Sequence, residues 1–222
     1  LMKSISKDDF ENDNFKFSTA KYITIEAIKI WTQRLSYVGE LGYELYVKSQ
    51  DAKKIYELLV DKGKNFNLSN CGMHAMDIMR MESGFLHWGH DISPEENQYQ
   101  AGLSFTISNK KDVDFIGKSA LKNIDQEKIK TRFAMFTLKD SKPGEPLLLH
   151  DEPIYLEDKI IGRSTSGNYS FNFKKNITFG YINNDLSNEK LKDSKLFIEV
   201  EKKKYEIELI NKPLKQTNFK TN

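Results

Sequence analysis

The sequence predicts an α+β fold over residues 1–124, followed by an all-β domain over residues 125–222. Three patterns support this prediction. Apolar and polar residues alternate before residue 48, two stretches with a helical apolar stripe occupy residues 51–83, and short alternating segments separated by turns fill the chain after residue 130. The chain has 222 residues, of which 38% are hydrophobic and 30% are charged, as is typical of a folded globular protein.

The first elements are expected to be strands. Residues 1–22 are polar with three interspersed phenylalanines, and we expect a loop or short turns that pack these rings onto a core. Residues 22–30 alternate in part between apolar and polar side chains, which predicts a half-buried strand. A second strand is predicted over residues 31–37, and a third over residues 43–47.

Two helices are predicted next. Residues 51–62 carry an apolar stripe, with Ser49 or Asp51 as the expected N-cap and Gly63 as the expected end. Residues 70–83 form the second predicted helix, with Gly84 directly after it.

Four further elements are predicted over residues 93–130. Residues 93–96, Ser-Pro-Glu-Glu, are typical of a helix start. Residues 103–107 predict a strand, residues 115–121 lead into a short helix, and the charged residues 126–130 predict a linker.

The all-β domain is predicted from seven short segments at regular spacing. This pattern is typical of a small antiparallel barrel or a sandwich. Residues 165–170 are rich in Ser and Thr, and we expect them to form a polar loop between strands. The predicted strands are residues 132–138, 146–149, 154–156, 159–166, 178–182, 195–200 and 205–210.

Charge and cysteine content limit the possible partners and compartments. The chain has 34 Lys and Arg against 32 Asp and Glu, so a net charge of +2 gives no reason to expect nucleic acid or a membrane surface as a partner. The single cysteine, Cys71, cannot form an internal disulfide, which favours a reducing compartment and predicts a cytoplasmic protein. No apolar run approaches the ~20 residues that a bilayer-spanning helix needs.

Two pairs of potential metal ligands do not predict a metal site. His87 and His90 are three residues apart across a glycine, and Cys71 and His74 are also three apart. A metal site needs three or four converging ligands, so local hydrogen bonding is the more common role of such pairs. Cys71 at a helix start is also a potential nucleophile, but a single structural cysteine is the more common case.

The stretch around Glu40 is the strongest candidate for ligand binding. Glu40 lies between Gly39 and Gly42, and glycines allow the backbone to approach a flat ligand. Its carboxylate can accept two parallel hydrogen bonds from adjacent N–H groups, as a pterin ring offers, while Tyr37 and Tyr43 can supply ring faces. The alternative interpretation is an ordinary solvated turn.

Six segments resemble, in the same order, those of the glycine-cleavage T-protein (aminomethyltransferase) family. Each is weak alone, but together they cover about residues 30 to 220. The resemblance implies that the chain is a partial aminomethyltransferase fold with a terminal antiparallel β-barrel. The six segments are residues 36–45, 72–84, 88–92, 101–103, 114–121 and 162–170.

Within this family, residues 87–97 are most similar to the folate-binding region of dimethylglycine and sarcosine dehydrogenases. The resemblance implies tetrahydrofolate-dependent transfer of an aminomethyl or one-carbon unit derived from a small methylated amine. Tetrahydrofolate is the implied cofactor, and FAD is implied only if a separate upstream domain or subunit exists. A missing N-terminal portion and a flavin subunit are the implied protein partners.

The resemblance also assigns residues to the folate site. Glu40 corresponds to the pterin-binding glutamate of the family, Phe219 to an aromatic folate contact and Arg80 to an arginine of the family's helix. The aromatic residues Tyr37, Tyr43 and Trp88 complete the predicted set.

Three departures from the family limit what the resemblance implies. Met76 stands where many members have an arginine that contacts folate, and Gln100 stands where glutamate is common. The catalytic aspartate of the family lies in the first half of the fold, and nothing in residues 1–22 resembles that segment. No catalytic residue is therefore assigned, and whether the chain alone is an enzyme stays open.

Three other functions remain possible at this level. A folate-dependent demethylase uses the same fold and differs little in sequence. A non-catalytic folate-binding factor that assists iron–sulphur proteins is disfavoured, because residues 114–121 lack the cysteine expected there. A structural fragment that supports a partner subunit is the third alternative.

Overall fold

The computed structural model describes residues 1–108 and 113–219, which form two compact units. Unit 1 comprises Leu1–Ser83 and the chain from Lys215 onward, and unit 2 comprises Gly84–Leu214. We call residues 215–219 the C-terminal tail, which therefore belongs to the same unit as the N-terminal residues. The predicted boundary between residues 124 and 125 stays a prediction.

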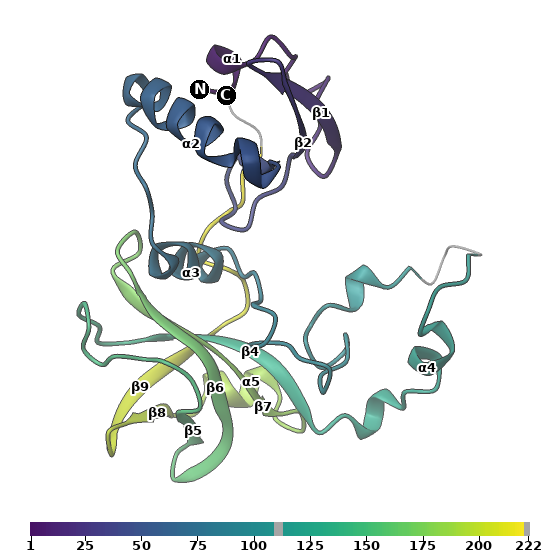
Figure 1. Ribbon diagram of the computed structural model, residues 1–222. Coiled ribbons are helices and arrows are strands. Elements are labelled where there is room, and N and C mark those ends of the chain that lie inside the picture. Colours follow the sequence, from purple (N-terminus) through teal and green to yellow (C-terminus); the bar gives the residue numbers. More distant parts are fainter. Residues whose placement is uncertain (109–112, 220–222) are drawn as a thin grey trace. The chain divides into compact units, whose positions relative to one another are not determined.

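Unit 1 contains a three-stranded antiparallel sheet in the order β1 (Ala20–Ile25), β2 (Ile28–Gln33) and β3 (Glu44–Tyr46). Side chains alternate between the two faces of a strand, and here one face is buried. Helix α2 (Ser49–Gly63) contributes Ile55 to the same core, and Figure 1 shows it beside this sheet. The core consists of Phe10, Phe15, Ile23, Ile25, Ile30 and Ile55.

The predicted strand over residues 22–30 is wrong, because a hairpin turn divides it. Glu26 and Ala27 have positive φ angles of 45° and 65° and join β1 to β2 as a two-residue turn. Such turns normally contain Asn or Gly, which adopt positive φ at little cost. Since neither residue is present, the sequence carried no turn signal at this point.

The other helices of unit 1 are shorter than α2. They are α1 (Met2–Ile5), a 3₁₀ turn (Lys64–Phe66) and α3 (Met73–Glu82). Lys48 rather than Ser49 or Asp51 is the N-cap of α2, and no side chain caps it. In the described part of the chain, no helix is both long and apolar enough to span a bilayer.

Unit 2 begins with turns and single helical turns, where two predictions are wrong. The N–H and hydroxyl of Ser93 both donate to Glu96 Oε2 (2.8 and 2.7 Å), and the hydroxyl accepts from the N–H of Glu95 (3.1 Å), but only turns follow. A 3₁₀ turn (Ser104–Thr106) replaces the strand predicted over residues 103–107. The predicted short helix is present as α4 (Lys118–Lys122), and a 3₁₀ turn (Gln126–Lys128) occupies the predicted linker.

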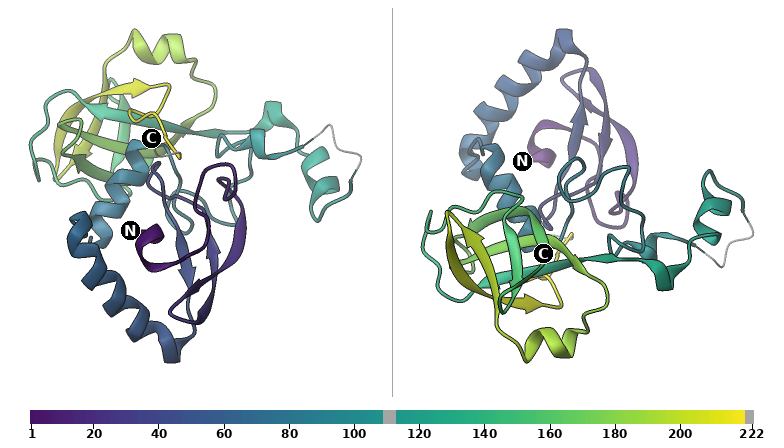
Figure 2. Two further views of the ribbon diagram at one scale, coloured as in Figure 1. Left: turned by 90° about the horizontal axis from the view of Figure 1, so that it is seen from above. Right: turned by 90° about the horizontal axis from the view of Figure 1, so that it is seen from below.

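The rest of unit 2 is a closed antiparallel barrel of six strands in the order β4-β7-β6-β5-β8-β9, with β4 also paired to β9 (Figures 1 and 2). The prediction of a small antiparallel barrel is thereby confirmed. The core is formed by inward aliphatic and aromatic side chains such as Phe136, Ile154 and Ile198. The strands are β4 (Thr131–Leu138), β5 (Pro153–Leu156), β6 (Lys159–Ser170), β7 (Lys175–Asn183), β8 (Leu196–Val200) and β9 (Lys203–Ile210).

Three details of the barrel differ from the prediction. Residues 146–149 do not form a strand, and a short helix, α5 (Asn188–Lys192), was not predicted. Residues 165–170 are not a loop but the second half of β6. Their hydroxyl-rich sequence was misleading because the polar groups are buried in the folded chain.

Candidate folate site and its supporting contacts

The loop between β2 and β3, residues 34–43, presents Glu40 to solvent. The hydroxyl of Ser36 accepts hydrogen bonds from the backbone N–H groups of Val38 (3.3 Å) and Glu40 (3.0 Å), which closes a tight turn. The Glu40 side chain is 56% exposed, so its carboxylate can meet a ligand.

Gly39 is required at its position in this turn. Its φ angle is +73°, and a Cβ atom there would lie 2.3 Å from the hydroxyl oxygen of Ser83. The same hydroxyl donates to the carbonyl oxygen of Val38 (3.2 Å), so the end of α3 fixes the turn. The close approach of the two segments depends on the absence of a side chain.

The C-terminal tail fixes the turn from another direction. The backbone N–H of Asn218 donates to the carbonyl oxygen of Gly39 (2.9 Å). Lys215 Nζ forms an ion pair with Glu40 Oε1 and donates to the carbonyl oxygen of Val38 (3.2 Å). The end of α3 and the C-terminal tail, which are far apart in the sequence, therefore both hold the turn that carries Glu40.

Phe219 and Phe17 form a stacked pair within unit 1. Their ring centroids lie 4.0 Å apart with an interplanar angle of 13°. The Phe219 carbonyl oxygen accepts a hydrogen bond from Arg34 Nη2 (3.0 Å). Phe219 was predicted as an aromatic contact, whereas Phe17 was not, because its partner is about two hundred residues away and no local pattern marks it.

Arg34 is a buried cation that the sequence did not reveal as important. It is 1% exposed, and its guanidinium donates to the carbonyl oxygen of Phe15, the side-chain oxygen of Asn12 and the Phe219 carbonyl. Its Nε is a buried donor without a hydrogen-bond partner among the described residues. Arg34 thus ties the N-terminal segment, β2 and the tail together.

Two of the predicted aromatic residues, Tyr43 and Tyr37, lie in different surroundings. Tyr43 packs edge-on against Phe10 and obliquely against Phe15, with centroid distances of 5.5 and 5.6 Å. Burial raises the pKa of its phenol. Tyr43 therefore packs against the core of unit 1, whereas Tyr37 is half-buried in the same turn as Glu40.

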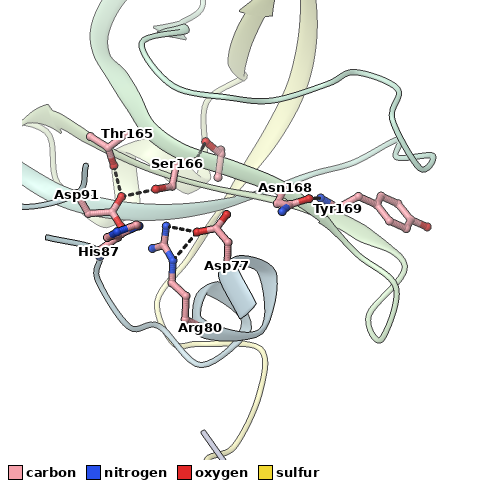
Figure 3. A network of polar contacts seen from close by, with 9 residues as sticks. Asp77, Arg80, His87, Asp91, Thr165, Ser166, Asn168 and Tyr169 are labelled. Carbon is pink, nitrogen blue, oxygen red and sulfur yellow. Dashed lines mark hydrogen bonds and ion pairs between the residues drawn. The ribbon is translucent and has the colours of Figure 1, made fainter. Parts of the chain in front are cut away.

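Arg80 is held inside its own unit. It is 1% exposed, and its Nε and Nη2 both contact Asp77 Oδ1, at 2.9 and 2.8 Å (Figure 3). These residues are three positions apart and so share one face of α3. This geometry supports a role for Arg80 in fixing the helix; direct contact with folate stays a prediction.

Trp88 lies in unit 2, on a turn whose anchor is Asp91. The Trp88 side chain is 65% exposed, while Asp91 is 1% exposed. The Asp91 carboxylate accepts hydrogen bonds from the Thr165 hydroxyl (2.5 Å), the Ser166 hydroxyl (2.8 Å) and the His87 N–H (2.9 Å), as Figure 3 shows in part. The turn is thereby fastened to barrel strand β6.

A β-bulge explains why two adjacent hydroxyls can bind one carboxylate. Neighbouring side chains of a regular strand point to opposite faces. The register of β6 against β7 shifts between Ser164 and Ser166, and Thr165 and Ser166 are both buried. The hydroxyl of Tyr181 on β7 adds a hydrogen bond to the carbonyl oxygen of Asp91 (2.8 Å).

The histidines of the same turn lie close together. The rings of His87 and His90 have centroids 4.6 Å apart. Among residues 1–108 and 113–219, no group of three or more His, Cys, Asp and Glu side chains is arranged to hold a metal ion. Cys71 is exposed just before α3.

Two family models match the chain. Residues 1–111 match the GCVT N-terminal domain, and residues 132–215 match the glycine cleavage T-protein C-terminal barrel domain. A solved aminomethyltransferase T of the glycine cleavage system from Bartonella henselae has the same fold, with a TM-score of 0.73 at 22% identity over 86% of this chain and 51% of that one.

The curated relatives include dehydrogenases and aminomethyltransferases. Mitochondrial dimethylglycine dehydrogenase of Rattus norvegicus is 33% identical over 96% of this chain but only 24% of its own length. Aminomethyltransferase of Alkaliphilus metalliredigens is 30% identical over 99% of this chain and 58% of its own length. The chain thus spans about a quarter of the length of this dehydrogenase. Since relatives are mitochondrial or bacterial, the cytoplasmic location stays a prediction.

The six sequence segments, the closed barrel and both family matches indicate the same family. The chain belongs to the glycine cleavage T-protein (aminomethyltransferase) family.

Proposed function

We propose that the chain binds a reduced folate through Glu40 and serves a protein that transfers a one-carbon unit to that folate. One observation carries the proposal. Glu40 presents an exposed carboxylate on a rigid turn, and its Oε2 has no hydrogen-bond or ion-pair partner among the residues that the structure describes. A carboxylate in this state can accept an N–H group at the edge of a pterin ring on Oε2.

The residues around Glu40 fit such a ligand in part. Tyr37 lies half-buried in the same turn, and Phe219 lies on the tail that contacts the turn. Met76 is half-buried and carries no charge where related proteins often have arginine. We therefore assign most of the ligand selectivity to Glu40.

The source of the one-carbon unit is proposed from the relatives. Several of them are named as dehydrogenases or oxidases of N-methyl amines, namely dimethylglycine, sarcosine and 4-methylaminobutanoate. We propose a small methylated amine as the source, with FAD in a separate domain or subunit. A folate-dependent demethylase is the second candidate, because the aminomethyltransferase fold alone does not distinguish the methylated donor.

Calorimetric titration with folinic acid, a stable reduced folate, tests the proposal. We expect saturable binding by the wild type and a loss of about 1.5–3 kcal/mol in Glu40→Gln, the contribution of hydrogen bonds to a charged group. Glu57→Gln is the matched control, since Glu57 is an exposed glutamate on α2. Equal affinities of wild type and Glu40→Gln would exclude Glu40 as the pterin contact.

A further inference from the structure

Lys215 is more firmly held than its partner Glu40. Its side chain is 17% exposed, whereas that of Glu40 is 56% exposed. Besides the ion pair, its ammonium donates to the Val38 carbonyl oxygen (3.2 Å), and its backbone N–H donates to the Glu82 carbonyl oxygen (2.8 Å). The position of the cation is therefore fixed by the chain around it, and the flexible carboxylate adapts to the cation.

The ion pair divides the two oxygens of the Glu40 carboxylate. Oε1 contacts Lys215, and Oε2 has no partner within the described residues. A glutamate side chain loses rotamer entropy when it is fixed, so a contact that fixes it in advance removes part of the cost of binding. Lys215 therefore leaves one oxygen oriented and available.

We propose that Lys215 is a positioning residue, which orients the Glu40 carboxylate so that Oε2 accepts an N–H group of the folate ring. This inference rests on the proposed function. It assigns a second role to the C-terminal tail, which carries both Lys215 and the predicted aromatic contact Phe219. The opposite relation, in which Lys215 competes with the ligand for Glu40, predicts the opposite effect of removing the cation.

A double-mutant cycle with folinic acid separates these roles. We expect Lys215→Met to bind about three- to tenfold more weakly, the scale of a partly exposed ion pair, and Lys215→Arg to recover most of the affinity. In a Glu40→Gln background, Lys215→Met should have no further effect, because it acts through the carboxylate. Lys212→Met, an exposed lysine three residues earlier, is the control and should bind as the wild type does.

The outcomes distinguish this inference from the proposed function. Failure of folinic acid to bind the wild type overturns both. Binding that depends on Glu40, together with unchanged or tighter binding by Lys215→Met, overturns the positioning role alone. A loss in Lys215→Met that is equally large in the Glu40→Gln background also overturns it, because the lysine then acts through the tail rather than through Glu40.

Discussion

Replacement of Asp91 by alanine should destabilise unit 2 strongly. The Asp91 carboxylate is 1% exposed and accepts hydrogen bonds from the hydroxyls of Thr165 and Ser166 on Oδ1 and from the N–H of His87 on Oδ2. Hydroxyls can rotate towards other acceptors, whereas a backbone N–H cannot. We assign about 1–3 kcal/mol to the stranded N–H and about 1 kcal/mol to each hydroxyl, so the expected loss is about 3–5 kcal/mol.

Asp91→Asn should be much milder, because its amide can satisfy the same groups. With its oxygen turned towards the His87 N–H, its NH₂ group faces the hydroxyls of Thr165 and Ser166, which can accept as well as donate. The charge assistance to these hydrogen bonds is lost, which corresponds to about 1–2 kcal/mol.

Urea unfolding followed by far-ultraviolet circular dichroism measures these differences. Asp193→Ala is the control, since Asp193 is exposed at the end of α5 and should change stability by no more than about 0.5 kcal/mol. The reasoning is refuted if Asp91→Ala loses less than about 1 kcal/mol, or if Asp91→Asn is as unstable as Asp91→Ala.

Three further predictions concern pH and the backbone. Burial raises the pKa of Tyr181, so its neutral form favours folding and the stability of the barrel should fall above about pH 10, more steeply than in Tyr181→Phe during alkaline urea titrations. Gly39→Ala should cost more than about 1 kcal/mol in thermal unfolding, because φ is +73° and a side-chain oxygen lies 2.3 Å from the added Cβ, whereas Gly72→Ala meets nothing within 4 Å and should be neutral. Replacing Glu26 and Ala27 by Asn-Gly should raise stability by about 1 kcal/mol in the same assay, and an unchanged midpoint would contradict the strain assigned to the positive φ angles.

Local patterns in the sequence determined most of the secondary structure. The apolar stripe of α2 and the regular spacing of the barrel strands are visible in short stretches of sequence, so they could be predicted. Predictions failed where the local signal was missing or misleading. The turn at Glu26 lacks Asn and Gly, so no local signal marked it. The hydrogen bonds between Ser93 and Glu96 close a turn rather than start a helix.

The sequence by itself determined the family, and the resemblance to that family singled out Glu40 as a predicted ligand contact, because the motif around it is a local feature. Only the tertiary structure decided which side chain contacts Glu40 and which distant polar groups meet within each unit. Lys215 reaches Glu40, Arg34 binds the Phe219 carbonyl, and a bulge aims Thr165 at a distant aspartate. Each of these contacts joins residues far apart in the chain. Long-range contacts are set by how the elements pack and by the need to satisfy buried polar groups, and neither leaves a periodic trace in the sequence.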